Sequence, residues 1–406
     1  MPSIDRRTLF AASAASAATF LTAARGAKAQ AAPVRVGVLT DMTGLYADAI
    51  GPGSFLAAQM AAEDAGGSVL GRKIEVLSAD NQNKADVGSA IARKWYDQDG
   101  VGMVVGMDNS SVALAVEQVA KDRNGIAVAI AVGTNDFTGK FCTPTAFAWN
   151  YDSYCLTNGI ATSLVARGLD TWFFLTVDYA FGASLEADAS NAVRAAGGKV
   201  LGSVRHPLNA GDFSSYLLAA KASGAKVVAL ANGGGDMTGA LKQANEFGLQ
   251  QGGQTLAPML CTNTDIHSLG LPVAQGISLM TSFTWNRTEQ TRAWSQKFIA
   301  RHKTMPSMDH AATYSAVGHY IKAIAAAGTT DTAAVAAKMR ELPVHDFYAD
   351  NAKLRADGRL VHDMYLVKVK KPAESHGPWD YEDVLQTVPG DKAFRPLAEV
   401  GCPLAG

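Results

Sequence analysis

The sequence lacks the local patterns on which many enzyme and metal sites depend. It contains neither a G-x-x-x-x-G-K-[ST] phosphate loop nor a G-x-S-x-G nucleophile elbow. Its eight histidines include no H-x-x-x-H pair, and no Asp-rich calcium loop is present. Because nothing local supports catalysis, we expect a protein that is not an enzyme and holds neither a cofactor nor a metal ion.

One glycine-rich segment comes close to a dinucleotide fingerprint. Gly233-Gly234-Gly235-Asp236-Met237-Thr238-Gly239 follows a predicted strand and opens a predicted helix. Thr238 occupies the place where the third glycine of G-x-G-x-x-G belongs. We therefore interpret the segment as a tight turn at a strand end that faces a cleft.

Cysteine is also scarce, with four in 406 residues: Cys142, Cys155, Cys261 and Cys402. None forms a C-x-x-C pair, which argues against a structural zinc site. In an oxidising compartment they would allow one or two disulfides. Four cysteines permit three full pairings, and spacing alone does not choose among them.

Basic clusters and long apolar runs are the remaining absences. The 36 basic and 37 acidic residues nearly balance, and no basic block occurs. We therefore expect neither nucleic acid nor an anionic membrane surface as a partner. After the first 30 residues the apolar stretches are short and broken by turns, which predicts no later membrane span.

The N-terminus has the features of an export signal. Arg6-Arg7 precede an apolar, Ala-rich stretch at residues 9–22, and Ala27-Lys28-Ala29 offers a small-x-small cleavage step. The stretch is shorter than the roughly 20 residues that span a membrane. We predict a signal peptide over residues 1–29 and a periplasmic location. The paired arginines favour a twin-arginine signal, and an ordinary secretory signal is the alternative.

The rest of the chain alternates short β-branched runs with Ala-rich amphipathic segments. Residues 34–131 contain four strand–helix repeats, and residues 152–260 contain a second series of four. Such alternation is typical of parallel sheets covered by helices on both faces. The predicted fold class is α/β, with two Rossmann-like lobes.

The pattern changes after the strand predicted at residues 277–281. Long helices are predicted at 289–303 and 310–327, and a short hairpin at 346–359 turns on Asp357-Gly358. To place these helices and this hairpin, the chain must cross between the lobes more than once. We expect lobe 1 to comprise 33–150 plus 283–345, and lobe 2 to comprise 151–282 plus 346–400.

Several stretches together resemble the type I periplasmic binding proteins, in the branch that serves as branched-chain amino-acid receptors of ABC transporters. Their order along the chain carries the resemblance, because each motif alone is weak. The matching stretches are Val36–Gly53, Gly106–Ser111, Ile126–Asn135, Asp178-Tyr179-Ala180-Phe181-Gly182 and Arg355-Ala356-Asp357-Gly358-Arg359.

The resemblance implies two lobes joined by a hinge of three crossover strands, with the ligand cleft between them. It implies a monomer that captures a small organic solute by hinge closure and delivers it to a membrane permease. A periplasmic sensory receptor of the same fold and a secreted α/β enzyme are the alternatives.

In the resembling proteins, the first lobe grips the ligand's carboxylate at two loops. Ser110, Ser111 and Thr134 match those positions, and Val132 lies in the same loop as Thr134. Both loops are predicted where a strand ends and a helix begins, so free N–H groups would favour an anion there. For Ser110, a helix N-cap is the alternative interpretation.

The second lobe departs from the amino-acid receptors. Phe181 matches an aromatic position but lacks a hydroxyl, and the acid that pairs with an ammonium aligns near Thr262, with Asp265 close by. Asn232 stands in a turn where those receptors carry a ring. A carboxylate with an apolar or aromatic body therefore fits best, with an amino acid as the other choice.

Aromatic residues near the predicted crossovers offer a wall for such a ligand. We predict that Tyr46 contacts the ligand and that at least one of Trp149, Tyr151 and Tyr154 faces the cleft. Trp285 is a further candidate, and packing within the hinge is the alternative for any single ring.

The C-terminal tail contains Gly401-Cys402-Pro403-Leu404, and similar proteins end in a like sequence. Because the tail has no regular structure to anchor it, the resemblance points to a Cys142–Cys402 disulfide. Unpaired thiols are the alternative.

Overall fold

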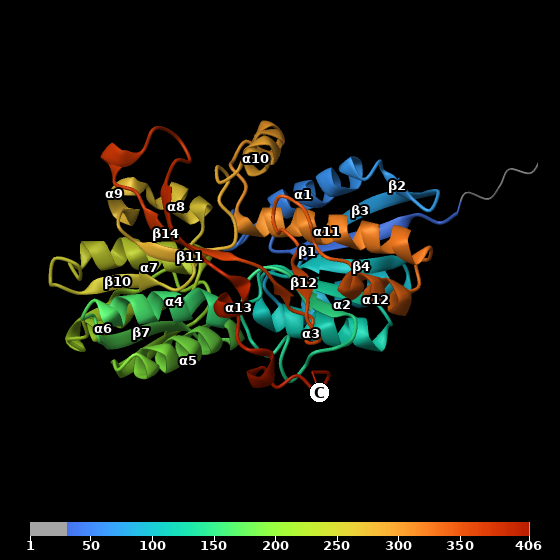
Figure 1. The fold of residues 1–406 in the computed structure, drawn as a ribbon. Coiled ribbons are helices and arrows are strands. Elements are labelled where there is room, and N and C mark those ends of the chain that lie inside the picture. The colour runs from blue at the N-terminus through green and yellow to red at the C-terminus, as the bar shows by residue number, and fades with distance from the viewer. Residues whose placement is uncertain (1–30, 406) are drawn as a thin grey trace, which may run out of the picture.

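A computed structural model describes residues 31–405 and contains two α/β lobes side by side (Figure 1). The predicted signal peptide at residues 1–29 lies outside the described residues. Within the described part of the chain, no helix combines the length and the apolar character needed to cross a membrane. The two-lobed α/β fold agrees with the prediction.

The first lobe is built on a six-stranded sheet of order β2-β3-β1-β4-β5-β6. All neighbours pair in parallel except β2 and β3, which form an antiparallel hairpin. The central strand reads Val-Arg-Val-Gly-Val-Leu-Thr, a β-branched run that suits a buried parallel strand. The strands are β1 (Val34–Thr40), β2 (Ser68–Val69), β3 (Arg72–Asp80), β4 (Val101–Gly106), β5 (Ile126–Ala129) and β6 (Ala146–Ala148).

Helices cover both faces of this sheet (Figure 1). The α1–α11 pair packs on one face and the α2–α3 pair on the other. Gly37 in β1 lets α2 pack closely on the sheet, because an added Cβ at this position would lie 2.5 Å from the Trp95 ring of α2. The helices are α1 (Gly51–Asp64), α2 (Ala85–Asp97), α3 (Ser110–Asp122), α10 (Glu289–His302), α11 (Met308–Ala327) and α12 (Thr332–Glu341).

The second lobe holds a parallel four-stranded sheet of order β10-β9-β7-β8. Its strands are β7 (Thr171–Val177), β8 (Lys199–His206), β9 (Val227–Ala231) and β10 (Thr255–Pro258). Its helices are α4 (Ser153–Ala166), α5 (Ala180–Ala195), α6 (Ser214–Ala222), α7 (Gly234–Glu246), α8 (Asn263–Leu269) and α9 (Leu271–Ala274).

An antiparallel sheet of order β11-β14-β15 completes the second lobe. Its strands are β11 (Ser278–Thr281), β14 (Met364–Val369) and β15 (Glu382–Val388), of which only β15 escaped the sequence-based prediction. That strand lies at the edge, and its central residues are exposed, so its sequence carries no buried alternation.

Three segments connect the lobes: residues 149–152, residues 282–288 and the stretch between α12 and β14. The third segment contains the hairpin of β12 (Lys353–Leu354) and β13 (Leu360–Val361). This hairpin lies against the first lobe, since Arg359 bridges to Ala148 at the end of β6 and β12 contacts α12. These contacts with β6 and α12 favour assigning the hairpin segment, residues 346–361, to the first lobe.

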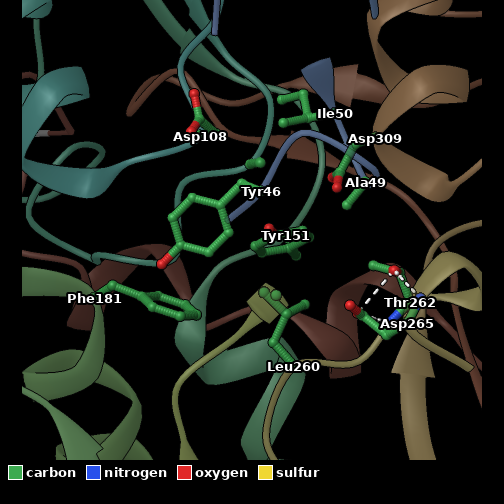
Figure 2. A pocket seen from close by; sticks show the side chains of 12 residues that line it. Tyr46, Ala49, Ile50, Asp108, Tyr151, Phe181, Leu260, Thr262, Asp265 and Asp309 are labelled. Carbon is green, nitrogen blue, oxygen red and sulfur yellow. Dashed lines mark hydrogen bonds between the residues drawn. The ribbon is translucent and has the colours of Figure 1, made fainter. Parts of the chain in front are cut away.

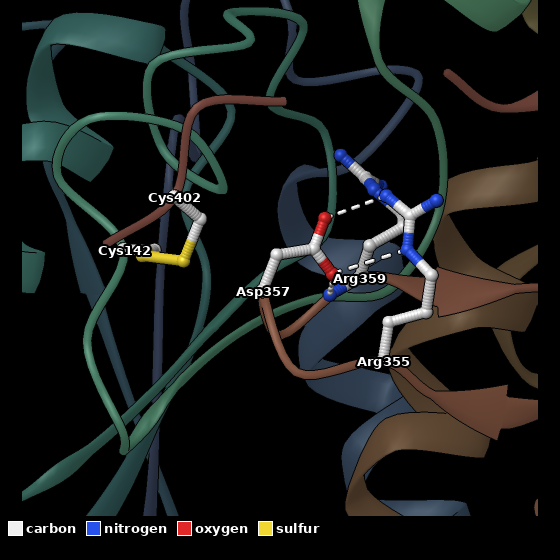
Figure 3. Close-up of a disulfide and its surroundings, with 5 residues drawn as sticks. All are labelled: Cys142, Arg355, Asp357, Arg359 and Cys402. Atoms are coloured by element: carbon white, nitrogen blue, oxygen red, sulfur yellow. Dashed lines mark hydrogen bonds and ion pairs between the residues drawn. A yellow bond between two sulfur atoms is a disulfide. The ribbon is translucent and has the colours of Figure 1, made fainter. Parts of the chain in front are cut away.

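The C-terminal tail returns to the first lobe after the short helix α13 (Gly390–Ala393). There Cys402 forms a disulfide with Cys142, with 5.8 Å between the two Cα atoms (Figure 3). Cys155 and Cys261 are unpaired and buried. The pairing agrees with the one that the family resemblance implied.

Removing this disulfide should destabilise the fold and leave the cleft intact. The bond closes a loop over a sequence separation of 260 residues, so its loss frees much chain entropy in the unfolded state. We expect Cys402→Ser to lower the free energy of unfolding by about 2–5 kcal/mol, measured by urea titration. A reductant should destabilise the wild type and not the variant; equal stability of the two proteins would contradict the expectation.

Candidate functional site

A cavity lies between the lobes, at the carboxyl ends of their parallel strands (Figure 2). Its volume is about 20 Å³, room for about one water molecule, so the lobes are closed around it. A solute larger than water could enter only after they part. The lining residues are Tyr46, Ala49, Ile50, Asp108, Ala131, Tyr151, Phe181, Gly234, Leu260, Thr262, Asp265 and Asp309.

Asp108 is the acidic residue at the end of β4. Its Oδ1 accepts hydrogen bonds from the backbone N–H of Asp41, at 2.9 Å, and from Nδ2 of Asn81, at 2.7 Å. Its Oδ2 is buried and has no hydrogen-bond partner among the described residues. The side chain is thus held by one oxygen and leaves the other free to accept a donor from a ligand.

Two further carboxyl groups reach the cavity from helix N-termini. Asp309, in the first turn of α11, accepts a 2.7 Å hydrogen bond from Nδ2 of Asn150. Asp265 belongs to a capping box at the start of α8, where its Oδ2 accepts bonds of 2.8 Å from the N–H and the hydroxyl of Thr262 (Figure 2).

The cavity carries acidic groups without a basic partner. Among the described residues that line it, none is lysine, arginine or histidine. Burial, with smaller contributions from neighbouring acids, raises the pKa of Asp108 and that of Asp265 to about 6, and the pKa of Asp309 to about 8. A cation bound here would relieve the cost of ionising these groups, whereas a lone carboxylate would add to it.

Aromatic side chains form the rest of the wall. Tyr46 comes from the first lobe, Tyr151 from the first crossover and Phe181 from α5 (Figure 2). Burial raises the pKa of Tyr46 and of Tyr151, so both hydroxyls stay protonated. Gly182 lets α5 begin tightly against β7, because an added Cβ would lie 2.0 Å from the carbonyl oxygen of Val177. This close approach sets Phe181 at the cavity.

Two direct contacts join the lobes at the loop that carries Leu45 and Tyr46. The hydroxyls of Tyr46 and Tyr179 lie 2.7 Å apart, and the N–H of Gly235 donates to the carbonyl oxygen of Leu45 at 3.0 Å. Between them lies Gly234, with φ +55°, where an added Cβ would come within 2.4 Å of the Leu45 oxygen. The glycine-rich turn is therefore the surface on which the 45–46 loop of the first lobe rests.

The residues predicted to grip an acid group do not line this cavity. Oγ of Ser110 accepts a 3.3 Å bond from the N–H of Thr134, and Oγ1 of Thr134 accepts one of 3.2 Å from Ser184. The N-cap of α3 is Asn109, whose side chain accepts from the N–H of Ser111. Ser110 and Thr134 are almost fully buried, so these loops hold each other and the lobe boundary.

Among the other predicted residues, Tyr46, Phe181 and Asp265 line the cavity, and Val132, Trp149 and Asn232 do not. Trp149 is buried and donates to Oγ of Ser315. Asn232 is buried against His206. Of the three crossover aromatics, Tyr151 lines the cavity.

The crossover rings outside the cavity have other contacts. Tyr154 lies against the Arg395 guanidinium. Trp285 donates to the carbonyl oxygen of Trp379, in the loop before β15. Both therefore pack within the hinge region, the alternative considered for any single ring.

Asp108 and Asp309 escaped the sequence reasoning. Asp108 precedes the serine pair by two residues and directly follows a strand end, so its position gave a usable signal. Asp309 lies in a helix far along the chain and reaches the cavity only because the chain crosses back to the first lobe. Residues 31–405 contain no cluster of His, Cys, Asp and Glu that could hold a metal ion.

Comparisons with known proteins agree with this architecture. Residues 33–375 match the family model described as periplasmic binding protein. A solved periplasmic binding protein from Burkholderia mallei is 46% identical, with a TM-score of 0.90, covering 92% of this chain and 99% of its own. A branched-chain amino-acid ABC transporter periplasmic ligand-binding protein from Burkholderia xenovorans is 40% identical, with a TM-score of 0.82, covering 92% and 100%.

A curated relative from Brucella melitensis, Leu/Ile/Val-binding protein homolog 6, is 26% identical over 238 residues, which are 57% of this chain and 58% of the relative. This chain thus spans somewhat more than half the length of that relative. The family match covers most of the chain, and the solved structures share its two-lobed fold. The chain therefore belongs to the periplasmic binding protein family.

Proposed function

We propose that this protein is the periplasmic substrate-binding component of an ABC importer and that its ligand is a small amine or amino acid with an apolar or aromatic body. The ligand enters between open lobes, and closure buries it. The protein acts as a monomer, performs no chemistry and hands the ligand to a membrane permease. Residues 1–29 direct its export.

The observation that carries the ligand class is the charge of the cavity. Asp108, Asp265 and Asp309 line it without a basic residue among the described lining. A protonated nitrogen would supply the missing positive charge and donate to the free Oδ2 of Asp108. Tyr46, Tyr151 and Phe181 would enclose the body of the ligand. Sequence reasoning had favoured an acid; the cavity favours a cationic group.

The relatives support an amino acid within this class. The Burkholderia xenovorans protein is a branched-chain amino-acid ABC transporter periplasmic ligand-binding protein. An amino acid would also carry a carboxylate, for which Ser110, Ser111 and Thr134 remain the predicted grip. Thr134→Val tests it: affinity for an amino acid should fall about tenfold or more, and affinity for the matching amine should not change.

The division of the chain is part of the proposal. Lobe 1 comprises residues 33–150, 283–345 and the hairpin segment 346–361, and lobe 2 comprises residues 151–282 and 362–400. The pairing of Ala148 with Arg359 supports the place of the hairpin.

Matched ligands test the charge requirement. Phenylalanine, 2-phenylethylamine and 3-phenylpropionate share one body, and leucine, 3-methylbutylamine and 4-methylpentanoate share another. At about 100 times its dissociation constant, a ligand stabilises the fold by about 2.7 kcal/mol, which a thermal-shift assay detects. We expect a shift with an amino acid or amine of at least one series and none with the acids. A shift with an acid alone would overturn the proposed ligand class.

Closure can be tested at the glycine-rich turn. Gly234→Ala would put a Cβ against Leu45 and Tyr46 in the closed protein, and overpacking costs roughly 1–3 kcal/mol. We expect about fivefold to a hundredfold weaker ligand binding, measured by titration calorimetry. Gly224→Ala is the matched control, since Gly224 has φ +64° and open space around it. Equal effects of the two changes would argue against closure at this turn.

A further inference from the structure

One buried side chain, that of Asn150, connects the acidic cavity with all three segments that join the lobes. Asn150 lies in the first crossover and is fully buried. Its Nδ2 donates to Oδ1 of Asp309 at 2.7 Å. The hydrogen bond runs from the hinge to a residue that lines the cavity.

The oxygen of the same amide accepts hydrogen bonds from the other two crossovers. Oγ of Ser282, in the second crossover, donates to Oδ1 of Asn150 at 2.6 Å. The hydroxyl of Tyr348, in the third, donates to the same oxygen at 3.1 Å. Both donors are buried, so neither bond competes with bulk water.

The backbone of Asn150 adds a further tie to the third crossover. Nε2 of His362 lies 3.0 Å from its carbonyl oxygen, and Nδ1 of the same ring lies 2.9 Å from the carbonyl oxygen of Asp363. Nη1 of Arg359 donates to the next carbonyl oxygen, that of Tyr151, at 3.1 Å. The side-chain amide therefore donates to Asp309 on one side and accepts from Ser282 and Tyr348 on the other.

We propose that Asn150 is a positioning residue that fixes the Asp309 carboxyl in the cavity and couples it to the three hinge segments. A ligand that binds to Asp309 then affects the hinge segments through the Asn150 side chain. The inference rests on the proposed closure of the lobes, but it does not depend on which solute closes them.

Exchanging the donor and the acceptor tests this coupling. Asn150→Asp keeps an oxygen for Ser282 and Tyr348 and loses the N–H that Asp309 accepts. Asp309→Asn in the same chain restores the bond in reverse, with the amide at 309 donating to the carboxylate at 150. The readout is hydrogen exchange of the ligand-free protein by mass spectrometry, over peptides containing residues 149–152, 281–284 and 348–363.

In N150D we expect exchange in all three segments to rise about tenfold or more, the equivalent of one charged hydrogen bond. The N150D/D309N double variant should return to near the wild-type rates. Peptides of β9, which the network does not touch, should exchange alike in all proteins. Unchanged hinge exchange in N150D, or a folded double variant without recovery, would overturn the inference.

A second pair of variants covers the case in which N150D does not fold. Ser282→Ala and Tyr348→Phe each remove one donor to the amide oxygen and leave Asp309 untouched. If Asn150 connects the segments, each change should also raise exchange in the crossover that it does not occupy; a purely local rise would overturn the inference. Because no ligand is used, failure of the matched ligand series would leave this result unaffected.

Discussion

Asp108→Asn should make the ligand-free protein more stable and nearly abolish binding of an amine. In the closed protein burial raises the pKa of Asp108 to about 6, above the roughly 3.9 of an exposed aspartate. The folded state therefore holds this proton more tightly than the unfolded state, and stability is lost as the pH rises through 6. At pH 7.5 the asparagine should avoid a cost of about 2–3 kcal/mol.

The same change removes the charge that we expect to face the ligand nitrogen. Loss of one partner of a buried, hydrogen-bonded charge pair costs about 2–5 kcal/mol, or at least about thirtyfold in affinity. Calorimetric titration and thermal unfolding at pH 7.5 measure the two effects. An Asp108→Asn variant that binds the amine as tightly as the wild type would show that this carboxylate does not hold it.

Glu117→Gln provides the matched control for Asp108→Asn. Glu117 is buried in α3 of the same lobe, both its carboxyl oxygens lack partners among the described residues, and burial raises its pKa to about 9. It does not line the cavity. Its replacement should also stabilise the protein at pH 7.5, because glutamine does not have to take up a proton on folding as the buried glutamate does, and should leave affinity unchanged. A variant that bound more weakly would show that removing any buried acid of this lobe disturbs the site.

Affinity for an amine should fall steeply as the pH is lowered. The closed protein holds a proton on Asp309 below about pH 8, and protons on Asp108 and Asp265 below about pH 6. A cationic ligand that pairs with the ionised groups must displace these protons, so its apparent affinity is highest at alkaline pH. Below the pKa of its group, each proton that must be displaced lowers the apparent affinity about tenfold for every unit by which the pH falls.

Between pH 8 and pH 6 the loss should therefore reach about a hundredfold from Asp309 alone. Titration calorimetry across this range, in buffers with different ionisation enthalpies, gives both the affinity and the number of protons released. In Asp309→Asn the dependence above pH 6 should disappear. An affinity that stays constant or increases toward pH 6 in the wild type would contradict the role given to these carboxyl groups.

The fold could be predicted from the sequence to a large extent because its signal is periodic. A buried parallel strand such as β9 reads as an unbroken apolar run between amphipathic helices. Three strands were not predicted: β2 and β6, which have two and three residues, and β15, an exposed edge strand without such a run. The hairpin at residues 353–361 was predicted from its Asp-Gly turn, but its lobe depends on tertiary contacts with β6 and α12.

The site could be predicted only in part, because the sequence locates strand ends more easily than it locates side-chain directions. Tyr46, Tyr151 and Phe181 were aromatic candidates for the cleft, and all three line the cavity. In the loop after β4, Oγ of Ser110 accepts from the N–H of Thr134, while Asp108 faces the cavity. Asp309 depends on a long-range crossing, which local patterns do not encode.

A crystal structure of the protein with the tightest-binding amine or amino acid of the matched series would test the central claim most directly. We predict the ligand nitrogen within about 3 Å of Oδ2 of Asp108 and of a carboxylate oxygen of Asp265 or Asp309. The body of the ligand should lie between Tyr46, Tyr151 and Phe181. A ligand whose nitrogen points away from all three carboxylates, or one bound outside this cavity, would contradict the account.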